Sequence, residues 1–373
     1  MTPNLTDWDA ASNLWVLSRH EDVLQVSKQA DVFSAAQGVL PESDAMVSIV
    51  CMDDPRHMRL RKLVNRGFTP RMVGLLHEKI RTLAKGIADA VASRGECELV
   101  RELAVPLPLY IIAEMLGIRH EDFDRFHEWS DRLIGVAGNY HDPVKMNESV
   151  TAYLEYGEYL KGVFEDRRRE PREDLVSILV TAQQDGMLAE DEEAMENDEI
   201  VMFMTLLLVA NETTRNAISG GMLALMQDRE QLELLRSRPE LMDSAVEEIL
   251  RFVSPIICFR RTATRDTEIR GQVIKAGDRV LMLYQSANRD EAVFADPDRF
   301  DVTRAPNPHL AFGIGPHFCL GANLARLELE VMVQELIARF PDIRLAPGSA
   351  PKRSASTLVA GIEHLPVVFS RAA

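Results

Sequence analysis

The sequence predicts a mainly α-helical fold with a minor β portion, organised as a single large domain over residues 1–373. Apolar residues recur at helical spacing through most of the chain, whereas the alternation typical of strands is confined to short pieces. No internal repeat and no low-complexity stretch long enough to be a linker divides the chain. Hydrophobic residues make up 46% of it, which is enough for a sizeable core.

The helical spacing gives each predicted helix its extent. It predicts helices over residues 72–92, 107–116, 150–164, 174–184, 198–226, 229–236, 242–252 and 322–340. The longest apolar run, from Ile200 to Ala210, is shorter than the roughly 20 residues that cross a bilayer, so it predicts a buried helix and no membrane span. The acidic stretch 190–199 precedes this helix, where negative charge favours a helix N-terminus.

Strand character is limited to three places. Residues 13–17 read as one strand, and residues 267–283 read as strands broken at Arg270-Gly271 and again at 275–278. Residues 357–369 read as a hairpin that turns near Gly361. The β portion is therefore expected to be small.

Charge and cysteine usage narrow the class of protein. Lys plus Arg is 42 against 58 Asp plus Glu, a net charge of −16, which argues against a nucleic-acid-binding surface. The four cysteines are scattered without a C-x-x-C, which indicates a reducing compartment and no disulfide framework. The polar, acidic start has no signal-peptide pattern, so we expect a cytoplasmic protein.

One cysteine stands in a distinctive setting. The segment F-G-I-G-P-H-F-C-L-G surrounds it with glycines, an aromatic and a histidine, immediately before a predicted helix: Phe312, Gly313, Gly315, His317, Cys319 and Gly321. Glycine turns and a helix N-terminus aim N–H groups at the sulfur, and both are expected to lower the thiol pKa. Zinc is disfavoured because Cys51, Cys97 and Cys258 are far away in sequence. The alternative is a small buried apolar cysteine.

A second constellation interrupts the apolar helix, where Glu212 and Thr213 stand between apolar runs. An acid beside an alcohol can relay protons from solvent to a bound oxygen species. Neighbours on a helix point about 100° apart, so the two should connect through water. Thr213 could also bond back to the carbonyl of Val209. The alternative is a helix face that turns towards solvent.

The cysteine segment resembles the haem-binding loop of the cytochrome P450 family, whose haem iron is held by a Cys thiolate. The resemblance extends over nearly the whole chain, although the chain starts later than is usual for the family. It implies the P450 fold, haem b bound by Cys319, and a distal helix in which Asn211-Glu212-Thr213 matches the end of the family's oxygen-binding motif. Val209 and Ala210 replace the usual small-residue pair, with Ala210 beside the haem.

The resemblance also implies supporting residues. His57, Arg61, Arg261 and His317 would bind the haem propionates, with Arg260 competing with Arg261. The family's E-x-x-R pair and a downstream P-x-R-F segment imply a buried structural cluster, formed here by Glu248, Arg251 and Arg299. Residues expected to line a largely apolar substrate pocket are Phe203, Leu206, Leu207, Val209, Ile256, Ile257 and Leu358.

The implied activity is monooxygenation, the hydroxylation of an unactivated C–H of a hydrophobic small molecule by dioxygen, with a sterol side chain or a terpenoid favoured. Electrons would come from a ferredoxin-type donor and a separate reductase, because the chain has no flavin or dinucleotide motif. Basic residues suited to docking an acidic donor are Arg56, Arg59, Arg61, Lys62, Arg66 and Arg71. Two alternatives stay open: a peroxide-driven haem-thiolate enzyme and a non-catalytic haem or gas sensor.

Overall fold

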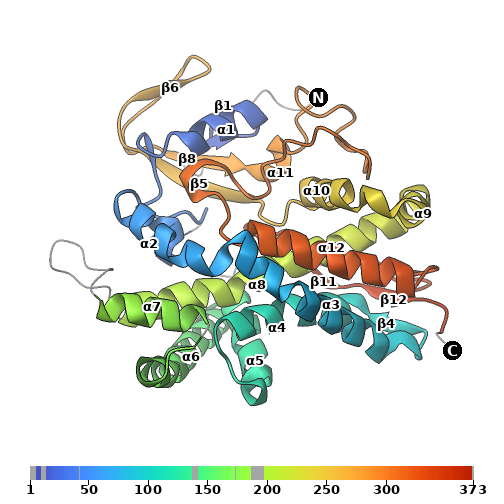
Figure 1. The fold of residues 1–373 in the computed structure, drawn as a ribbon. Coiled ribbons are helices and arrows are strands. Elements are labelled where there is room, and N and C mark those ends of the chain that lie inside the picture. Colours follow the sequence, from blue (N-terminus) through green and yellow to red (C-terminus); the bar gives the residue numbers. More distant parts are fainter. Residues whose placement is uncertain are drawn as a thin grey trace.

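The computed structural model describes residues 6–9, 14–41, 43–136, 142–172, 174–185 and 197–371. Helices dominate it and gather on one side, with most of the β structure on the other (Figure 1). The helices are α1 His20–Lys28, α2 Arg56–Val64, α3 Pro70–Ala92, α4 Pro106–Met115, α5 Phe123–Ile134, α6 Pro143–Arg169, α7 Leu175–Gln184, α8 Asn197–Gln227, α9 Arg229–Ser237, α10 Met242–Val253, α11 Tyr284–Ala287 and α12 Ala322–Arg339. The mainly α fold with a minor β portion is confirmed.

Short helical turns connect several of these elements: η1 Ser48–Cys51, η2 Asn65–Phe68, η3 Val100–Ala104, η4 His120–Asp122, η5 Pro239–Leu241 and η6 Gly315–His317. The strands are β1 Thr6–Asp9, β2 Leu14–Leu17, β3 Phe33–Ser34, β4 Glu96–Glu98, β5 Cys258–Ala263, β6 Thr267–Ile269, β7 Gln272–Ile274, β8 Arg279–Leu283, β9 Arg344–Leu345, β10 Lys352–Arg353, β11 Ile362–His364 and β12 Pro366–Val368.

The main sheet has the strand order β1-β2-β8-β5-β3. Strand β2 pairs parallel with β8, and the other neighbours pair antiparallel. One face of this sheet packs with α1 and α11 around a separate apolar cluster that includes Leu17, Val23, Val280 and Met282. Since β5 carries Arg260 and Arg261, this sheet places two of the predicted site residues.

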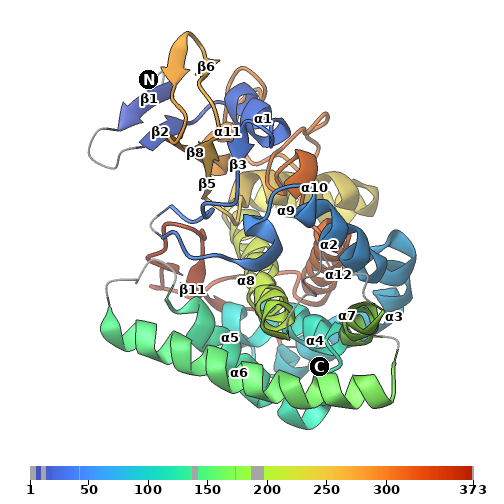
Figure 2. The ribbon, with the colours of Figure 1, turned by 90° about the vertical axis from the view of Figure 1, so that its left-hand side faces the viewer.

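Helix α8 is the central element of the helical side and contacts α4, α6, α10 and α12 (Figures 1 and 2). It belongs to the largest apolar core, which extends from α2 to β12. Helix α6 runs along the outside of this core (Figure 2). Among the described helices, none combines the length and the apolar character that a bilayer crossing requires.

The hairpin predicted over residues 357–369 is wrong. Strand β11 pairs with β10, so the turn spans residues 354–361, and β12 pairs instead with β4 and β9. Strands of two or three residues carry too little alternation to reveal their partners. Helices α1, α2 and α5 were not predicted from the sequence, because each is short and rich in polar residues. The acidic stretch before α8 lies largely outside the described residues.

Candidate functional site

The loop that carries Cys319 is closed by its own backbone. The amide of Cys319 donates to the carbonyl oxygen of Phe312 at 2.9 Å, and Phe318 donates to Gly315 at 3.0 Å. Helix α12 begins directly after it, with Gly321 at its N-cap. The half-buried thiol is therefore fixed at the start of α12, as the sequence predicts.

Gly315 adopts the left-handed turn expected of a glycine in this loop and also allows a close approach to a neighbouring helix. Its φ of +77° is in the left-handed region, and a Cβ built on it would lie 2.5 Å from the carbonyl oxygen of Ser27 on α1. The close approach is thus to a neighbouring helix. Gly315 allows the loop to pack against α1, which fixes the loop relative to the main sheet.

Burial raises the pKa of the Cys319 thiol, against the expectation of a lowered value. A hydrogen bond from the backbone of Gly321 and the positive charges of Arg61 and Arg326 act in the opposite direction. The N–H groups and charges anticipated from the sequence are present, but desolvation of the sulfur outweighs them. They favour the thiolate without being sufficient to produce it.

Four basic side chains converge beside this loop, and they are the ones predicted from the sequence. The rings of His57 on α2 and His317 on η6 are 4.2 Å apart. Arg61 donates to the carbonyl oxygen of Phe318 at 2.5 Å. Burial, followed by the positive charges of Arg261, His57 and Arg61, lowers the pKa of His317 to about 3. The four residues therefore form one cluster, here called the cationic cluster, in which Arg61 and Arg261 carry the positive charge and burial keeps the two histidines neutral.

The structure also separates the two adjacent arginines of β5. Arg260 donates to the backbone oxygen of Gln37 at 2.8 Å and pairs with Asp44 at 2.6 Å. Arg261 points to the other face of the strand, where it acts on His317. Arg261, and not Arg260, belongs to the cationic cluster.

This cluster fits the carboxylates of a haem. Within the described part of the chain, neither Arg61 nor Arg261 has a carboxylate at ion-pair distance, and His317 Nδ1 is buried without a hydrogen-bond partner. Buried cations and an unpartnered donor are the groups that two propionates would satisfy. Cys319, in the loop beside this cluster, would be the protein's ligand to the metal.

Helix α8 presents one accessible face although its other faces are buried. The half-buried or exposed positions Met202, Leu206, Val209, Ala210 and Thr213 recur every three or four residues, and Ala210 is the most exposed. Phe203 and Leu207 lie off this stripe and are buried in the main core. Of the pocket residues predicted on α8, Leu206 and Val209 share the accessible face with Ala210 and Thr213.

The acid and the alcohol of α8 point to different sides of the helix, as expected. The hydroxyl of Thr213 donates to the carbonyl oxygen of Ala210, three residues back, at 2.9 Å. The hydrogen bond to Val209, four residues back, that the sequence suggested is not formed. Glu212 is buried, and its Oε1 accepts from Arg215 at 2.6 Å and from Asn216 at 2.9 Å. Its Oε2 is buried without a hydrogen-bond partner.

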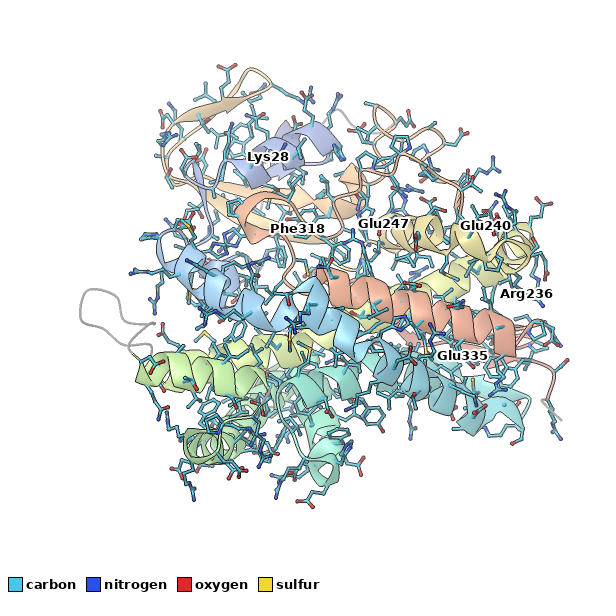
Figure 3. All side chains as sticks on the ribbon, in the orientation of Figure 1. Lys28, Arg236, Glu240, Glu247, Phe318 and Glu335 are labelled. Carbon is cyan, nitrogen blue, oxygen red and sulfur yellow. The ribbon has the colours of Figure 1, made fainter. Side chains whose placement is uncertain are left out.

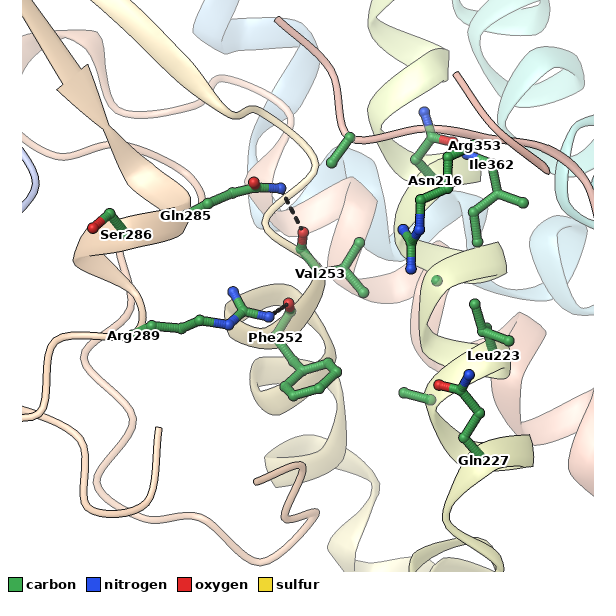
Figure 4. Close-up of a pocket in the computed structure, with 13 residues that line it drawn as sticks. Asn216, Leu223, Gln227, Phe252, Val253, Gln285, Ser286, Arg289, Arg353 and Ile362 are labelled. Carbon is green, nitrogen blue, oxygen red and sulfur yellow. Dashed lines mark hydrogen bonds between the residues drawn. The ribbon is translucent and has the colours of Figure 1, made fainter. Parts of the chain in front are cut away.

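A pocket of about 440 Å³ lies between α8, the C-terminal end of α10 and the segment around α11 (Figure 4). Asn216 lines it, together with Gln285, Arg289 and Arg353. Asn216 bonds Glu212 on one side and accepts from the amide of Ile362 at 3.2 Å on the other. Nothing in the order of residues distinguished Asn216 or Arg215, yet these two residues hold the carboxylate of Glu212.

The other predicted pocket residues come from two segments that meet. The amide of Ile257 donates to the carbonyl oxygen of Leu358 at 2.8 Å, and Ile256 forms a β-bridge with Val359. Ile256, Ile257 and Leu358 are half-buried apolar side chains. They form a continuous apolar edge beside β5.

The buried charge cluster predicted around Glu248 and Arg251 is present, but Arg304 takes the place predicted for Arg299. Glu248 and Arg251 are both fully buried and form two hydrogen bonds of 2.8 Å. The third charged group is Arg304, whose Nε lies 3.1 Å from Glu248. The side chain of Arg299 is exposed, and only its carbonyl oxygen accepts from Arg251 at 3.2 Å, so its assignment is wrong. A turn closed by a hydrogen bond from the amide of Arg299 to the carbonyl oxygen of Asp296, at 3.0 Å, directs the side chain of Arg299 outward.

Comparison with protein-family models identifies one family over almost the whole chain. The model of the cytochrome P450 family matches residues 8–367. The chain belongs to the cytochrome P450 family. It is therefore a haem-thiolate monooxygenase, an oxidoreductase that uses dioxygen and a redox partner and acts on hydrophobic substrates.

Named relatives of this P450 are bacterial. A steroid C26-monooxygenase of Mycobacterium tuberculosis is 41% identical over 362 residues, which cover 96% of this chain and 95% of the relative. A methyl-branched lipid omega-hydroxylase of Mycobacterium bovis is 41% identical over 99% of this chain and 87% of its own length.

Solved P450 structures share its fold. A P450 of Bacillus megaterium in complex with testosterone has a TM-score of 0.87 at 34% identity and covers 98% of this chain, with 95% of its own length matched. A P450 of Mycobacterium marinum in complex with pseudoionone has a TM-score of 0.88 at 34% identity, over 99% of this chain and 88% of its own.

Proposed function

We propose that this P450 binds haem b and hydroxylates an unactivated C–H of a steroid side chain or of a branched aliphatic lipid. The observation that carries the proposal is the Cys319 loop beside the cationic cluster of His57, Arg61, Arg261 and His317. The names of the mycobacterial relatives support the substrate class. A single domain and a cytoplasmic location remain predictions.

In this proposal each group of residues has a distinct task. When bound, haem supplies dioxygen activation and the oxidation of the C–H bond. Cys319 would hold the metal, and the cationic cluster would bind the propionates. The apolar face of α8, with Leu206 and Val209, would hold the substrate and exclude water. Thr213 would hold a proton at its hydroxyl, close to where oxygen binds.

Glu212 would supply that proton from solvent. Its unpartnered Oε2 and its bond to Asn216, which lines the pocket of Figure 4, support a supply from that side of α8. Because Arg215 and Asn216 both bond Oε1, they would hold the carboxyl in place between transfers.

We also propose a ferredoxin-type donor that docks over α2. Exposed basic residues are Arg56, Arg59 and Lys62 on α2, Arg66 on η2 and Arg71 on α3. Arg61 bonds Phe318 next to Cys319. Positive charge near the thiolate loop would steer an acidic partner, at a rate that falls as salt is added.

The test uses purified, haem-loaded protein. After reduction and addition of carbon monoxide, we expect the red-shifted Soret band of a thiolate-ligated adduct, and we expect Cys319→Ala to lose it. The matched control is Cys258→Ala. Titration of the wild type with steroids and branched lipids should shift the haem spin state, and a reconstituted ferredoxin system should give the hydroxylated product. A wild type without the band, or product formation from peroxide but not from the electron donor, would refute the proposal.

Thr213→Ala is expected to keep haem binding and to release several-fold more peroxide per product formed, because the proton at its hydroxyl is lost. The readouts are haem content and the ratio of peroxide to product. The control is Thr205→Ala, since Thr205 lies on the same helix and bonds back to the carbonyl of Val201 at 2.8 Å. Equal coupling in wild type and Thr213→Ala would rule out the relay role.

A further inference from the structure

Three polar side chains outside the motifs used above, a carboxylate, a guanidinium and an imidazole, meet behind the Cys319 loop. Glu247 on α10 accepts from Arg326 on α12 through both oxygens, with distances of 2.6 and 2.9 Å. The same carboxylate lies 3.0 Å from Nε2 of His309, in the segment that leads into the loop. Glu247 therefore connects α10, α12 and the approach to the loop; Figure 3 labels it near Phe318.

This cluster reaches the cysteine through one aromatic ring. The guanidinium carbon of Arg326 lies 4.6 Å from the centre of the Phe312 ring, a cation–π distance. The ring of His309 lies 6.1 Å from that of Phe312. The carbonyl oxygen of Phe312 in turn accepts from the amide of Cys319 at 2.9 Å. A displacement of Arg326 would therefore move Phe312 and, through it, the loop that carries Cys319.

The charges of the cluster are balanced. Burial tends to raise the pKa of Glu247, but hydrogen bonds from Arg326 and His309 outweigh it and lower the pKa to about 2. Glu247 is thus ionised at neutral pH, and it opposes the positive charge of Arg326. The side chain of His309 is only 3% exposed, so solvent screens this part of the cluster weakly.

We propose that Glu247 and Arg326 are positioning residues that set the reduction potential of the haem: Glu247 holds Arg326 against Phe312 and cancels its charge next to the thiolate. The proposal rests on the haem-thiolate function above. An uncancelled positive charge favours the reduced haem, and an uncancelled negative charge favours the oxidised haem. The two single variants should consequently act in opposite directions.

The experiment measures the ratio of reduced to oxidised haem against a dye of known potential. We expect Glu247→Gln to raise this ratio roughly fivefold to tenfold at a fixed dye potential, and Arg326→Gln to lower it by a similar factor. The double variant Glu247→Gln/Arg326→Gln should return close to the wild type. Arg326→Lys should keep the potential close to the wild type while weakening the grip on Phe312, seen as a smaller thiolate fraction of the carbon monoxide complex.

The control is Glu335→Gln, at the other end of α12, where Glu335 lies 4.0 Å from Arg339 (Figure 3). Its potential should equal that of the wild type. Shifts of the same sign in both single variants, or no shift in either, would overturn the proposal. If one single variant binds haem poorly, the double variant still tests the proposal, because a potential that departs from the wild type would also overturn it. A wild type without a thiolate band would instead refute the proposed function, so the two failures are distinguishable.

Discussion

Arg251→Leu is expected to destabilise the protein by about 3–5 kcal/mol, because it leaves a buried carboxylate without its partner. Glu248 and Arg251 are both 0% exposed. Besides the two bonds to Glu248, the guanidinium donates to the backbone oxygens of Asn288 at 2.9 Å and Pro297 at 2.7 Å. The loss therefore also releases the irregular segment between α11 and the Cys319 loop.

Haem binding should fall with stability in Arg251→Leu. Asn288 receives the amide of Leu310 at 2.7 Å, and residue 310 bonds Gly313 at the start of the loop. Two further hydrogen bonds thus connect Asn288, which accepts from Arg251, to Gly313 at the start of the cysteine loop. Urea unfolding of the haem-free protein and the haem content of the purified variant are the measurements.

The comparison variants replace Arg304, which completes the cluster of Glu248 and Arg251, and Arg299, which the sequence predicted in that place. Arg304→Leu should also destabilise, since Arg304 bonds Glu248 and the backbone oxygens of Ala295 and Asp296. Arg299→Leu should change the free energy of unfolding by less than about 0.5 kcal/mol, because its side chain is exposed. A larger cost for Arg299→Leu than for Arg304→Leu would contradict the assignment.

The replacement of Arg299 by Arg304 in the cluster shows which site residues can be predicted from sequence and which cannot. The cysteine loop is predictable because its residues are contiguous, so their order alone carries the chemistry. Residues 295–304 have no helix or strand, and no periodicity tells which of two arginines points inward. The cluster of Glu247, His309 and Arg326 draws on three distant segments, and nothing in the order of residues links them.

Helix α8 was predictable in extent but not in orientation. Its residues are apolar on nearly every side, so no single hydrophobic stripe marks the face that packs. Phe203 and Leu206 look equivalent in sequence, yet the first is buried and the second lies on the accessible face. In β5, by contrast, alternation does separate Arg260 from Arg261, because neighbours in a strand face opposite ways.

Glu328→Gln is expected to stabilise the protein increasingly as the pH rises from about 5 to 8. Glu328 is buried in α12, and burial raises its pKa from the ordinary 4.5 to about 8. Between these values the folded protein keeps a proton that the unfolded chain has lost. Stability therefore falls with rising pH by about 1.4 kcal/mol per unit, and by roughly 3–5 kcal/mol in total at pH 8.

Glutamine has the shape of the protonated carboxyl and does not titrate, so the variant should lack this loss. Urea unfolding of wild type and Glu328→Gln should give nearly equal stabilities at pH 4.5 and the largest difference at pH 8. The control is Glu330→Gln, at a half-buried position on the same helix, which measures the effect of a glutamine in α12 away from the buried site. A constant difference for Glu328→Gln across this range would mean that Glu328 ionises normally in the folded protein. The expected slope instead makes Glu328 a neutral core residue, held protonated because α12 packs against α8 and α3 and leaves its carboxyl little access to water.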